Sequence, residues 1–543
     1  MLNSMKKRLD GHLCELSRRE WFQRSGWLAA PALLGVPGVA SAAASDDAPR
    51  TAGKLRIGPD IYQSIGVRPV INCRGTFTII GGSLELPEVR AAQEAAAKHY
   101  VQLDELMEAA GRRLAELTGA ESGMVSGGCA AALAHATTAC VTGGNPDLHV
   151  RVPDLRGFAK DEVVIPKHSR NEYDQAVRSV GVRIVEVGSP AEYEAALGPR
   201  VAMVYVLAGP AAENGPLNYD ILFGLAKKRN IPVLTDAAAE MLTVPNVHLG
   251  RGSTLVGYSG GKALRGPQCA GLLLGRKDLI EAAWVASAPH HGHGRSMKVG
   301  KEEVMGMLAA VEVWMKRDHE AEDRMWTLWM NNIANRVTKI EGVTATVREP
   351  HGLDNHSPGL EIAWDQEKLG ITGRELAHIL DTTEPRIALG GSGRGLSITA
   401  YMMSPGEDKI VGDRIHEILS APRSPKSSAP SPAPAGDLTG RWDVQIEFSA
   451  GSGNHTLYVQ QQGNRLTGTH QGDFVTRDFS GTIAGDEVHI DSNVGEVHGA
   501  ALSYRFSGKL AADMLSGDLE MGEYLGAKWT AKRHAFRSRN GAA

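Results

Sequence analysis

The chain contains few cysteines for its length. Only five occur among 543 residues, and none of them forms a CxxC pair. A framework of disulfide bonds and a zinc site built on such pairs are therefore both excluded. The stability of the protein must come from a buried core.

The chain also lacks an excess of charge of either sign. It carries 58 Lys and Arg residues against 62 Asp and Glu residues, a formal net charge of −4. A chain with this balance has no electrostatic field that would gather nucleic acid or an anionic membrane. We therefore expect no nucleic acid partner.

Length and composition indicate an ordinary globular protein of several domains. At about 150 residues per domain, the chain has room for three to four folding units. Hydrophobic residues make up 42% and charged residues 22% of the chain. These proportions exclude wholesale disorder.

Long apolar runs are scarce, and the one of note lies near the N-terminus. Residues 26–39 follow the pair Arg18-Arg19 and precede the small residues 40–44. This arrangement resembles a twin-arginine signal peptide spanning residues 1–44. The resemblance implies the twin-arginine export machinery as a partner, a periplasmic location and a cofactor loaded before export. An uncleaved anchor is the weaker alternative, because a bilayer-spanning helix needs about 20 residues.

The C-terminal part reads as a separate module. Residues 421–436 form a Pro/Ser/Ala linker, which should be extended and semi-rigid. From residue 437 to about 536, short alternating runs separated by Gly-rich turns predict a small all-β barrel or sandwich. Its Trp442, Tyr504 and Trp529 could line a ligand site, but core packing is the favoured interpretation.

Between residues 45 and 420, short apolar strands alternate with helical patterns. This alternation predicts an α/β domain whose mostly parallel central sheet has helices on both faces. The runs are largely apolar, as expected for parallel strands buried on both sides. Strands are predicted at 162–165, 182–187, 201–206, 231–235, 254–258 and 271–274, and flanking helices at 88–98 and 103–117.

Three landmarks fall at the ends of such strands, where open α/β sheets place their ligands. Residues 125–131 form a small-residue turn that opens a helix; it could hold a phosphate or simply pack tightly. Asp236 ends a strand and could bind a protonated ring nitrogen or cap the next helix. Lys262 follows another strand in a Gly-rich turn and could form a Schiff base or be merely solvated.

The order of these landmarks is informative. A phosphate turn, an aspartate and then a lysine 26 residues further on supply an anion cradle, a partner for a pyridinium nitrogen and an amine. These are the requirements of a pyridoxal phosphate site. The sequence therefore predicts pyridoxal 5'-phosphate as the cofactor.

Five stretches carry a family resemblance: 71–76, 103–106, 114–120, 259–268 and 294–303. They resemble the selenocysteine-synthase-like branch of fold type I pyridoxal phosphate enzymes, and within it the aminosugar-acid ammonia lyases. The likeness covers roughly residues 55–419. It implies a cofactor-binding large domain at 45–310, a small α+β C-terminal lobe at 311–420, and a homodimer or larger homo-oligomer.

The resemblance also implies roles for single residues. Lys262 should bind the cofactor covalently and Asp236 should hold its ring nitrogen. His168 should stack on the ring, with an ordinary surface-loop histidine as the alternative. Arg386 and Arg394 should bind a substrate carboxylate, although both could be plain surface residues. The residues implied around the phosphate are Ser126, Gly127, Gly128 and Ser259.

A loop with three histidines, His290, His291 and His293, invites comparison with a metal site. No nearby Cys or carboxylate arrangement completes a recognisable geometry, so we expect a substrate-facing loop and no metal.

The function implied is that of an exported pyridoxal phosphate-dependent lyase. Its reaction would be an α,β-elimination on a hydroxy amino acid or aminosugar acid, giving a 2-keto acid and ammonia. Export favours an unphosphorylated substrate. Racemisation, transamination and aldol cleavage on the same scaffold remain alternatives, as does a non-catalytic periplasmic binding protein. The presence of both Asp236 and Lys262 counts against the last of these.

Overall fold

The computed structural model describes residues 53–423, 431–492 and 503–535. The predicted signal peptide and the centre of the predicted linker lie outside the described residues. No helix within them is both long enough and apolar enough to cross a membrane. The segment 53–68 contains one short 3-10 helix, η1 (Gln63–Ile65).

The large domain is built on a seven-stranded sheet in the order β2-β8-β7-β6-β5-β3-β4. Four neighbouring pairs are parallel, and β8 runs antiparallel to both β7 and β2. The predicted mostly parallel sheet is confirmed, although the prediction missed β2. The strands are β2 (Ser122–Ser126), β3 (Glu162–Pro166), β4 (Arg183–Val187), β5 (Val201–Leu207), β6 (Val233–Asp236), β7 (Leu255–Ser259) and β8 (Gly271–Gly275).

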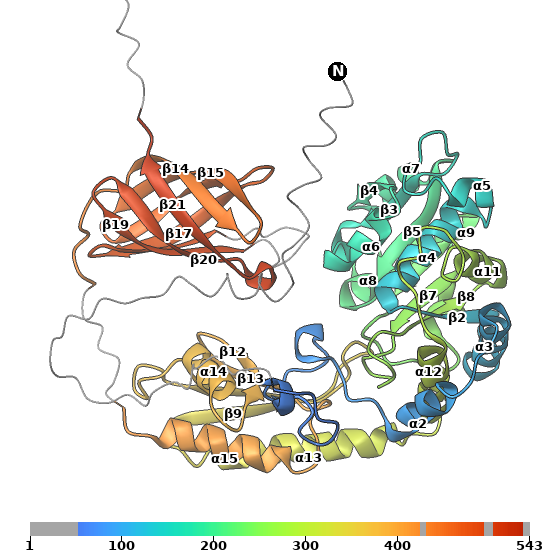
Figure 1. The fold of residues 1–543 in the computed structure, drawn as a ribbon, viewed down its shortest axis with the longest axis horizontal. Coiled ribbons are helices and arrows are strands. Elements are labelled where there is room, and N and C mark those ends of the chain that lie inside the picture. The colour runs from blue at the N-terminus through green and yellow to red at the C-terminus, as the bar shows by residue number, and fades with distance from the viewer. Residues whose placement is uncertain (1–52, 424–430, 493–502, 536–543) are drawn as a thin grey trace, which may run out of the picture. The chain divides into compact units, whose positions relative to one another are not determined.

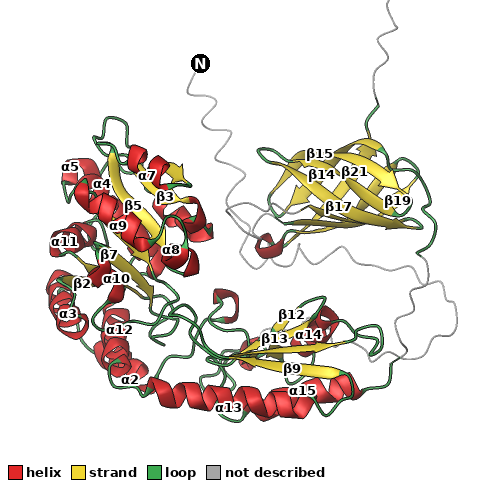
Figure 2. Cartoon of the chain, turned by 180° about the vertical axis from the view of Figure 1, so that it is seen from behind, coloured by secondary structure: helices red, strands yellow, loops and turns green. Residues whose placement is uncertain are grey.

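Helices cover both faces of this sheet (Figure 2). Side chains alternate across a strand, and here both sets are buried. Val163, Ile165 and Tyr205 belong to one core cluster, and Val164 and Val204 to another. Helices α4 (Cys129–Thr142) and α11 (Lys277–Val285) contribute to the first cluster, and α7 (Pro190–Ala196) and α9 (Tyr219–Lys228) to the second. Burial on both faces explains the near-continuous apolar strands of the sequence.

Shorter elements complete the large domain. The other helices are α2 (Pro87–Ala96), α3 (Leu103–Thr118), α5 (Pro146–His149), α6 (Gln175–Arg178), α8 (Pro210–Asn214), α10 (Val247–Arg251) and α12 (Lys301–Trp314). Single 3-10 turns are η2 (Thr78–Ile80), η3 (Lys167–Ser169) and η4 (Glu172–Asp174).

The small lobe has its own antiparallel sheet, in the order β12-β13-β10-β9. Helices α13 (His319–Val337) and α15 (Glu407–Ser420) run side by side along it (Figure 1). Their apolar faces share one core with the strands, in which Ile333, Leu360 and Ile415 are buried. The remaining elements are β1 (Ile71–Asn72), paired with β11 (Ile387–Ala388), and β9 (Val343–Arg348), β10 (Gly359–Trp364), α14 (Gly373–Thr382), β12 (Gly390–Gly391) and β13 (Gly395–Thr399).

The C-terminal module is a closed antiparallel barrel in which every strand pairs with the next and β14 also pairs with β21. Trp442 and Trp529 are fully buried in its core, which confirms the packing interpretation for both; Tyr504 packs half-buried against that core. The strands are β14 (Gly440–Phe448), β15 (Gly451–Gln462), β16 (Arg465–Gln471), β17 (Thr476–Ala484), β18 (Glu487–Ser492), β19 (Tyr504–Ala511), β20 (Met514–Glu520) and β21 (Gly526–Arg533), with η6 (Gly522–Tyr524) before the last.

The barrel and the enzyme part should fold independently. The barrel core draws on residues 438–531 alone, and the other three core clusters end at residue 419. A chain ending at Ser420 should therefore stay soluble and still bind the cofactor, because removing the barrel uncovers none of those clusters. Expressing the two pieces separately and recording solubility and the visible absorbance of the cofactor tests this. An insoluble or colourless fragment beside a coloured full chain would place the boundary elsewhere.

Candidate active site

Lys262 stands in a turn that only glycine allows. Strand β7 ends at Ser259, and Gly260 and Gly261 lead into the lysine. A Cβ at Gly260 would lie 2.7 Å from the carbonyl oxygen of Ala270, and one at Gly261 would lie 2.8 Å from the Cα of Gln268. Side chains larger than hydrogen are therefore excluded at both positions. The turn places a partly buried lysine just beyond the carboxyl end of a central strand.

Asp236, the last residue of β6, is almost completely buried, at 2% exposure. Its Oδ2 accepts a hydrogen bond of 2.7 Å from the Tyr205 hydroxyl, and its Oδ1 accepts one of 3.1 Å from the amide of Ala238. Burial raises the pKa of this carboxyl, while these hydrogen bonds and the Lys262 ammonium oppose the rise. No helix begins directly after Asp236, so the alternative of a helix cap is wrong.

The three sequence landmarks meet at one edge of the sheet. Ser126, at the end of β2, pairs with Gly271, and Gly271 pairs in turn with Ser259 at the end of β7. Next to them, the Sγ of Cys129 lies 3.7 Å from the Oδ1 of Asp236. Burial and this carboxylate raise the pKa of Cys129, so its thiol stays uncharged. The phosphate turn, the aspartate and the lysine turn thus share the carboxyl edge, as the order of the motifs predicted.

The predicted phosphate turn fits an anion. Gly128 adopts a φ of +96°, and apart from its own atoms and its two chain neighbours, no heavy atom lies within 4 Å of the place where its Cβ would stand. Helix α4 begins directly afterwards, and no side chain caps its first amides. Such amides and the helix dipole bind phosphate. The hydroxyl of Ser126 donates to the Gly128 carbonyl at 2.8 Å and orders the turn.

His168 also fits a flat aromatic cofactor. It follows β3 within η3, is half-buried, and its buried Nε2 has no hydrogen-bond partner among the described residues. Burial lowers its pKa, so the ring is neutral at neutral pH. Stacking on the cofactor ring stays a prediction. Buried polar atoms normally have a hydrogen-bond partner, so the unpaired Nε2 is what we expect where a bound group completes the surroundings of this ring.

Several residues of this site escaped the sequence analysis. Asn171 donates to the Tyr205 hydroxyl at 3.1 Å, and Tyr205 in turn donates to Asp236. The ring centroid of Tyr173 lies 5.9 Å from the Nζ of Lys262. Tyr205 lies in an apolar strand that reads as plain core, and no signal in the sequence distinguishes it.

The two arginines predicted to bind substrate have other surroundings. Arg386 donates through Nε to the carboxylate of Asp381 at 3.0 Å. Arg394 is exposed in the turn between β12 and β13. Within the described ranges, neither makes a hydrogen bond to Lys262 or Asp236. Their role in binding a carboxylate stays a prediction without a structural contact behind it.

The histidine loop is engaged with the surface of the large domain. The Nε2 of His290 lies 3.2 Å from a carboxylate oxygen of Asp104, and the Nε2 of His293 lies 3.4 Å from the hydroxyl of Ser179. These contacts do not place the loop beside Lys262. In the part of the chain that the structure describes, no three His, Cys, Asp or Glu side chains gather as metal ligands.

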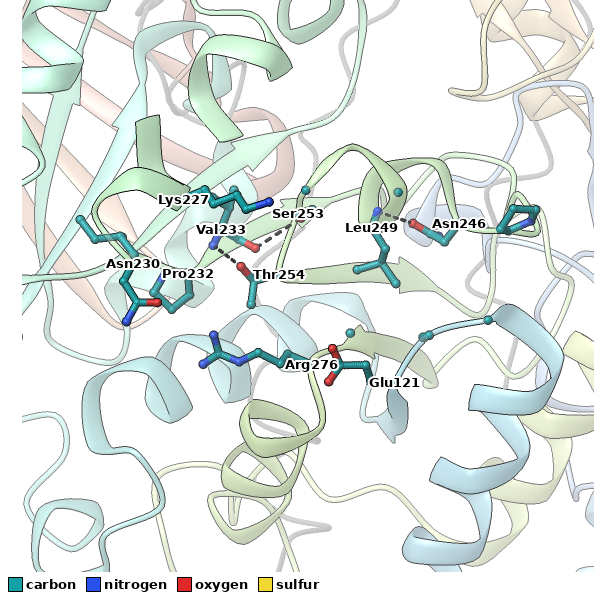
Figure 3. Close-up of a pocket in the computed structure, with 17 residues that line it drawn as sticks. Glu121, Lys227, Asn230, Pro232, Val233, Asn246, Leu249, Ser253, Thr254 and Arg276 are labelled. Atoms are coloured by element: carbon teal, nitrogen blue, oxygen red, sulfur yellow. Dashed lines mark hydrogen bonds between the residues drawn. The ribbon is translucent and has the colours of Figure 1, made fainter. Parts of the chain in front are cut away.

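A cavity of about 570 Å³ lies away from this chemistry (Figure 3). It is lined by Val233 and Thr254, at the amino ends of β6 and β7, and by Lys227 and Arg276. The amide of Val233 donates to the Thr254 hydroxyl there at 3.0 Å. Because Asp236 terminates the other end of β6, this cavity opens at the opposite edge of the sheet and is not the cofactor site.

Comparisons with known proteins show several relatives of the chain. The chain is 32% identical over 300 residues to D-glucosaminate-6-phosphate ammonia lyase of Salmonella typhimurium, covering 54% of this chain and 79% of that one. It is 31% identical over 374 residues to 5'-C-glycyluridine monooxygenase-decarboxylase of a Streptomyces species, covering 66% and 92%. L-seryl-tRNA(Sec) selenium transferase of Moorella thermoacetica is 27% identical over 296 residues, covering 47% and 58%.

Solved structures lead to the same group. The structure of D-glucosaminate-6-phosphate ammonia lyase superposes with a TM-score of 0.60 at 28% identity, covering 66% of this chain and 98% of that one. No family model matches the chain. From this relationship and the residues gathered around Lys262, we conclude that the chain belongs to the selenocysteine-synthase-like branch of fold type I pyridoxal phosphate enzymes and is a pyridoxal phosphate-dependent lyase.

Proposed function

We propose that the protein is an ammonia lyase that eliminates the β-hydroxyl of a hydroxy amino acid or an aminosugar acid and releases a 2-keto acid and ammonia. The observation that carries this proposal is the meeting of Lys262, Asp236 and the uncapped start of α4 at one sheet edge. A relative with 32% identity is named for such a reaction on D-glucosaminate 6-phosphate. A second relative is named for a different reaction, so the reaction subtype belongs to the proposal.

The residues divide the work as follows. Pyridoxal phosphate, when bound, stabilises negative charge at the Cα of an amino acid. The first amides of α4 hold its phosphate, and the Asp236 carboxylate keeps its ring nitrogen protonated. The Lys262 amine holds the cofactor and, once released, removes the proton from Cα. The His168 ring covers the cofactor and excludes water.

The substrate follows from location. If residues 1–44 export the folded protein to the periplasm through the twin-arginine machinery, the enzyme works outside the compartment that holds most phosphorylated sugar acids. We therefore propose an unphosphorylated substrate. Replacing Arg18 and Arg19 with lysine should keep the protein in the cytoplasm, and cell fractionation measures this. Export that survives the change would remove this argument.

A homodimer or larger even assembly is part of the proposal. Ile79, Leu84 and Tyr100 are exposed by 65% or more, and exposed apolar side chains of this size commonly mark interfaces between subunits. Light scattering should give at least twice the mass of one chain. A monomer would contradict this point alone.

A panel of D- and L-hydroxy amino acids and aminosugar acids, with and without phosphate, tests the reaction. We expect stoichiometric ammonia and 2-keto acid from an unphosphorylated member, and none from the Lys262→Ala protein. Loss of optical activity without ammonia would identify a racemase, and transfer of the amino group to a keto acid would identify an aminotransferase. Binding without turnover would favour a non-catalytic binding protein.

A further inference from the structure

A loop of the small lobe is fastened beside the residues that follow Asp236. The amide of Met241 donates to the carbonyl of Leu353 at 3.0 Å, and the amide of Asn355 donates to the carbonyl of Ala239 at 2.9 Å. Between these bonds, Glu240 and Asp354 form an antiparallel bridge. The pairing fixes the position of Asp354 relative to the sheet edge that carries the site.

The residue after Asp354 is held in an uncommon conformation. Asn355 has a φ of +45°, a left-handed conformation that asparagine tolerates better than most residues. Its Oδ1 accepts a hydrogen bond of 3.0 Å from the hydroxyl of Tyr401, which also lies 3.0 Å from the Thr76 hydroxyl. Such conformations persist only where the surroundings fix them, and they concentrate at functional sites.

Asp354 lies within the electrostatic influence of Lys262. Although solvent reaches its side chain, partial burial and the neighbouring charge of Glu240 raise its pKa, while the Lys262 ammonium opposes the rise. Its Oδ1 accepts a hydrogen bond of 3.0 Å from the side-chain Nδ2 of Asn355, and its Oδ2 accepts from no described residue. The amide of Ser259 donates to the carbonyl of Ala238 at 3.2 Å, so the backbone that pairs with the Asp354 loop also meets the turn that carries Lys262. An accessible carboxyl held beside that turn can donate a proton to a substrate.

Three other acidic side chains, Glu240, Glu322 and Asp323, each already contact a histidine or an arginine. Glu240 is buried and lies 2.6 Å from the Nε2 of His248. Glu322 accepts from Arg317 at 2.8 Å, and Asp323 lies 3.2 Å from the Nε2 of His356. Of these four described carboxyls, Asp354 is therefore the one with an oxygen available to a bound molecule.

We propose that Asp354 is the general acid that protonates the departing β-hydroxyl. This role rests on the elimination proposed above. The Cα–H electron pair forms the Cα–Cβ double bond as Lys262 takes the proton. The Cβ–O bond breaks, the oxygen keeps its electron pair and takes the carboxyl proton of Asp354, and water leaves. The Asp354 carboxylate regains a proton from solvent before the next turnover. Hydroxide is a poor leaving group, which is why the step needs an acid.

The test compares leaving groups. Each hydroxylated substrate is paired with its counterpart bearing chlorine at Cβ, as in serine and β-chloroalanine of one configuration, because chloride departs without a proton. We expect Asp354→Asn to lower elimination from the hydroxylated substrate by about 10²- to 10⁴-fold. Elimination from the chlorinated substrate should stay within about threefold of the original protein, since no acid is needed there.

Two controls separate this role from a structural one. The matched variant Asp323→Asn removes a nearby carboxyl of the small lobe and should leave the rate of elimination from both substrates unchanged. Visible absorbance and borohydride trapping of the cofactor on Lys262 should be unchanged in both variants. Equal losses on the two substrates, or no loss on the hydroxylated one, would overturn the acid role. If the original protein eliminates from neither substrate, the proposed elimination itself is wrong, and Asp354 has no such role.

Discussion

Replacing Lys262 with alanine should lower turnover by about 10³-fold or more, because covalent attachment of the cofactor and removal of the α-proton are lost together. The fold should survive. Lys262 is only partly buried and follows two glycines whose backbone fixes the turn without its side chain. Circular dichroism and the unfolding temperature should therefore match those of the original protein.

Borohydride reduction followed by peptide mapping gives the direct readout of this prediction. In the original protein the cofactor should become fixed to the peptide that contains Lys262, and in Lys262→Ala to none. Lys227→Ala is a suitable control, because this lysine lines the cavity at the opposite edge of the sheet. Trapping on a different lysine would reject the assignment.

Asp236→Asn should lower turnover by roughly 10- to 150-fold, corresponding to about 1.5–3 kcal/mol for a charge-assisted hydrogen bond. The change keeps the shape of the side chain and removes the charge that holds the ring nitrogen protonated. It also turns an amide NH₂ toward one of two donors, the Tyr205 hydroxyl or the Ala238 amide. A lower unfolding temperature should therefore accompany the loss of turnover.

Tyr205→Phe is the matched comparison for this aspartate. It removes one hydrogen bond from the carboxylate and leaves the charge in place, so its effect on turnover should be several-fold smaller than that of Asp236→Asn. Steady-state kinetics of both variants shows whether turnover depends on the charge of Asp236 or on the hydrogen bond that positions its carboxylate. Turnover of Asp236→Asn within a factor of two of the original protein would rule out a role for the charge.

The site residues that the sequence revealed share one property. Asp236 is the last residue of the apolar strand β6, and Lys262 stands three residues after the end of β7. The ends of parallel strands converge at one edge of the sheet whatever the details of packing. The same reasoning located most of the large sheet. It missed β2, because the last two residues of this strand, Val125 and Ser126, were assigned to the small-residue turn at 125–131.

Contacts between segments that are far apart in the chain could not be predicted from the sequence. Asp354 stands in a stretch that looks like an ordinary polar turn, and its significance comes from pairing with residues more than a hundred positions earlier. Arg386 is a second example. Its predicted role in substrate binding stays a prediction, and the sequence did not show that its Nε donates to the carboxylate of Asp381. Sequence patterns report local geometry, and pairing across lobes depends on the complete fold.

The closure of the C-terminal barrel limits how this module can meet other molecules. An open sheet offers unpaired backbone amides and carbonyls to which a foreign strand can be added. Here β14 and β21 are paired along six positions, so the sheet is closed and has no edge strand with unpaired backbone groups. A ligand of this module therefore cannot be bound by addition of a strand, and side chains or loops must make its contacts. For the same reason, two molecules cannot associate through edge-to-edge pairing of strands of this barrel, even at high concentration.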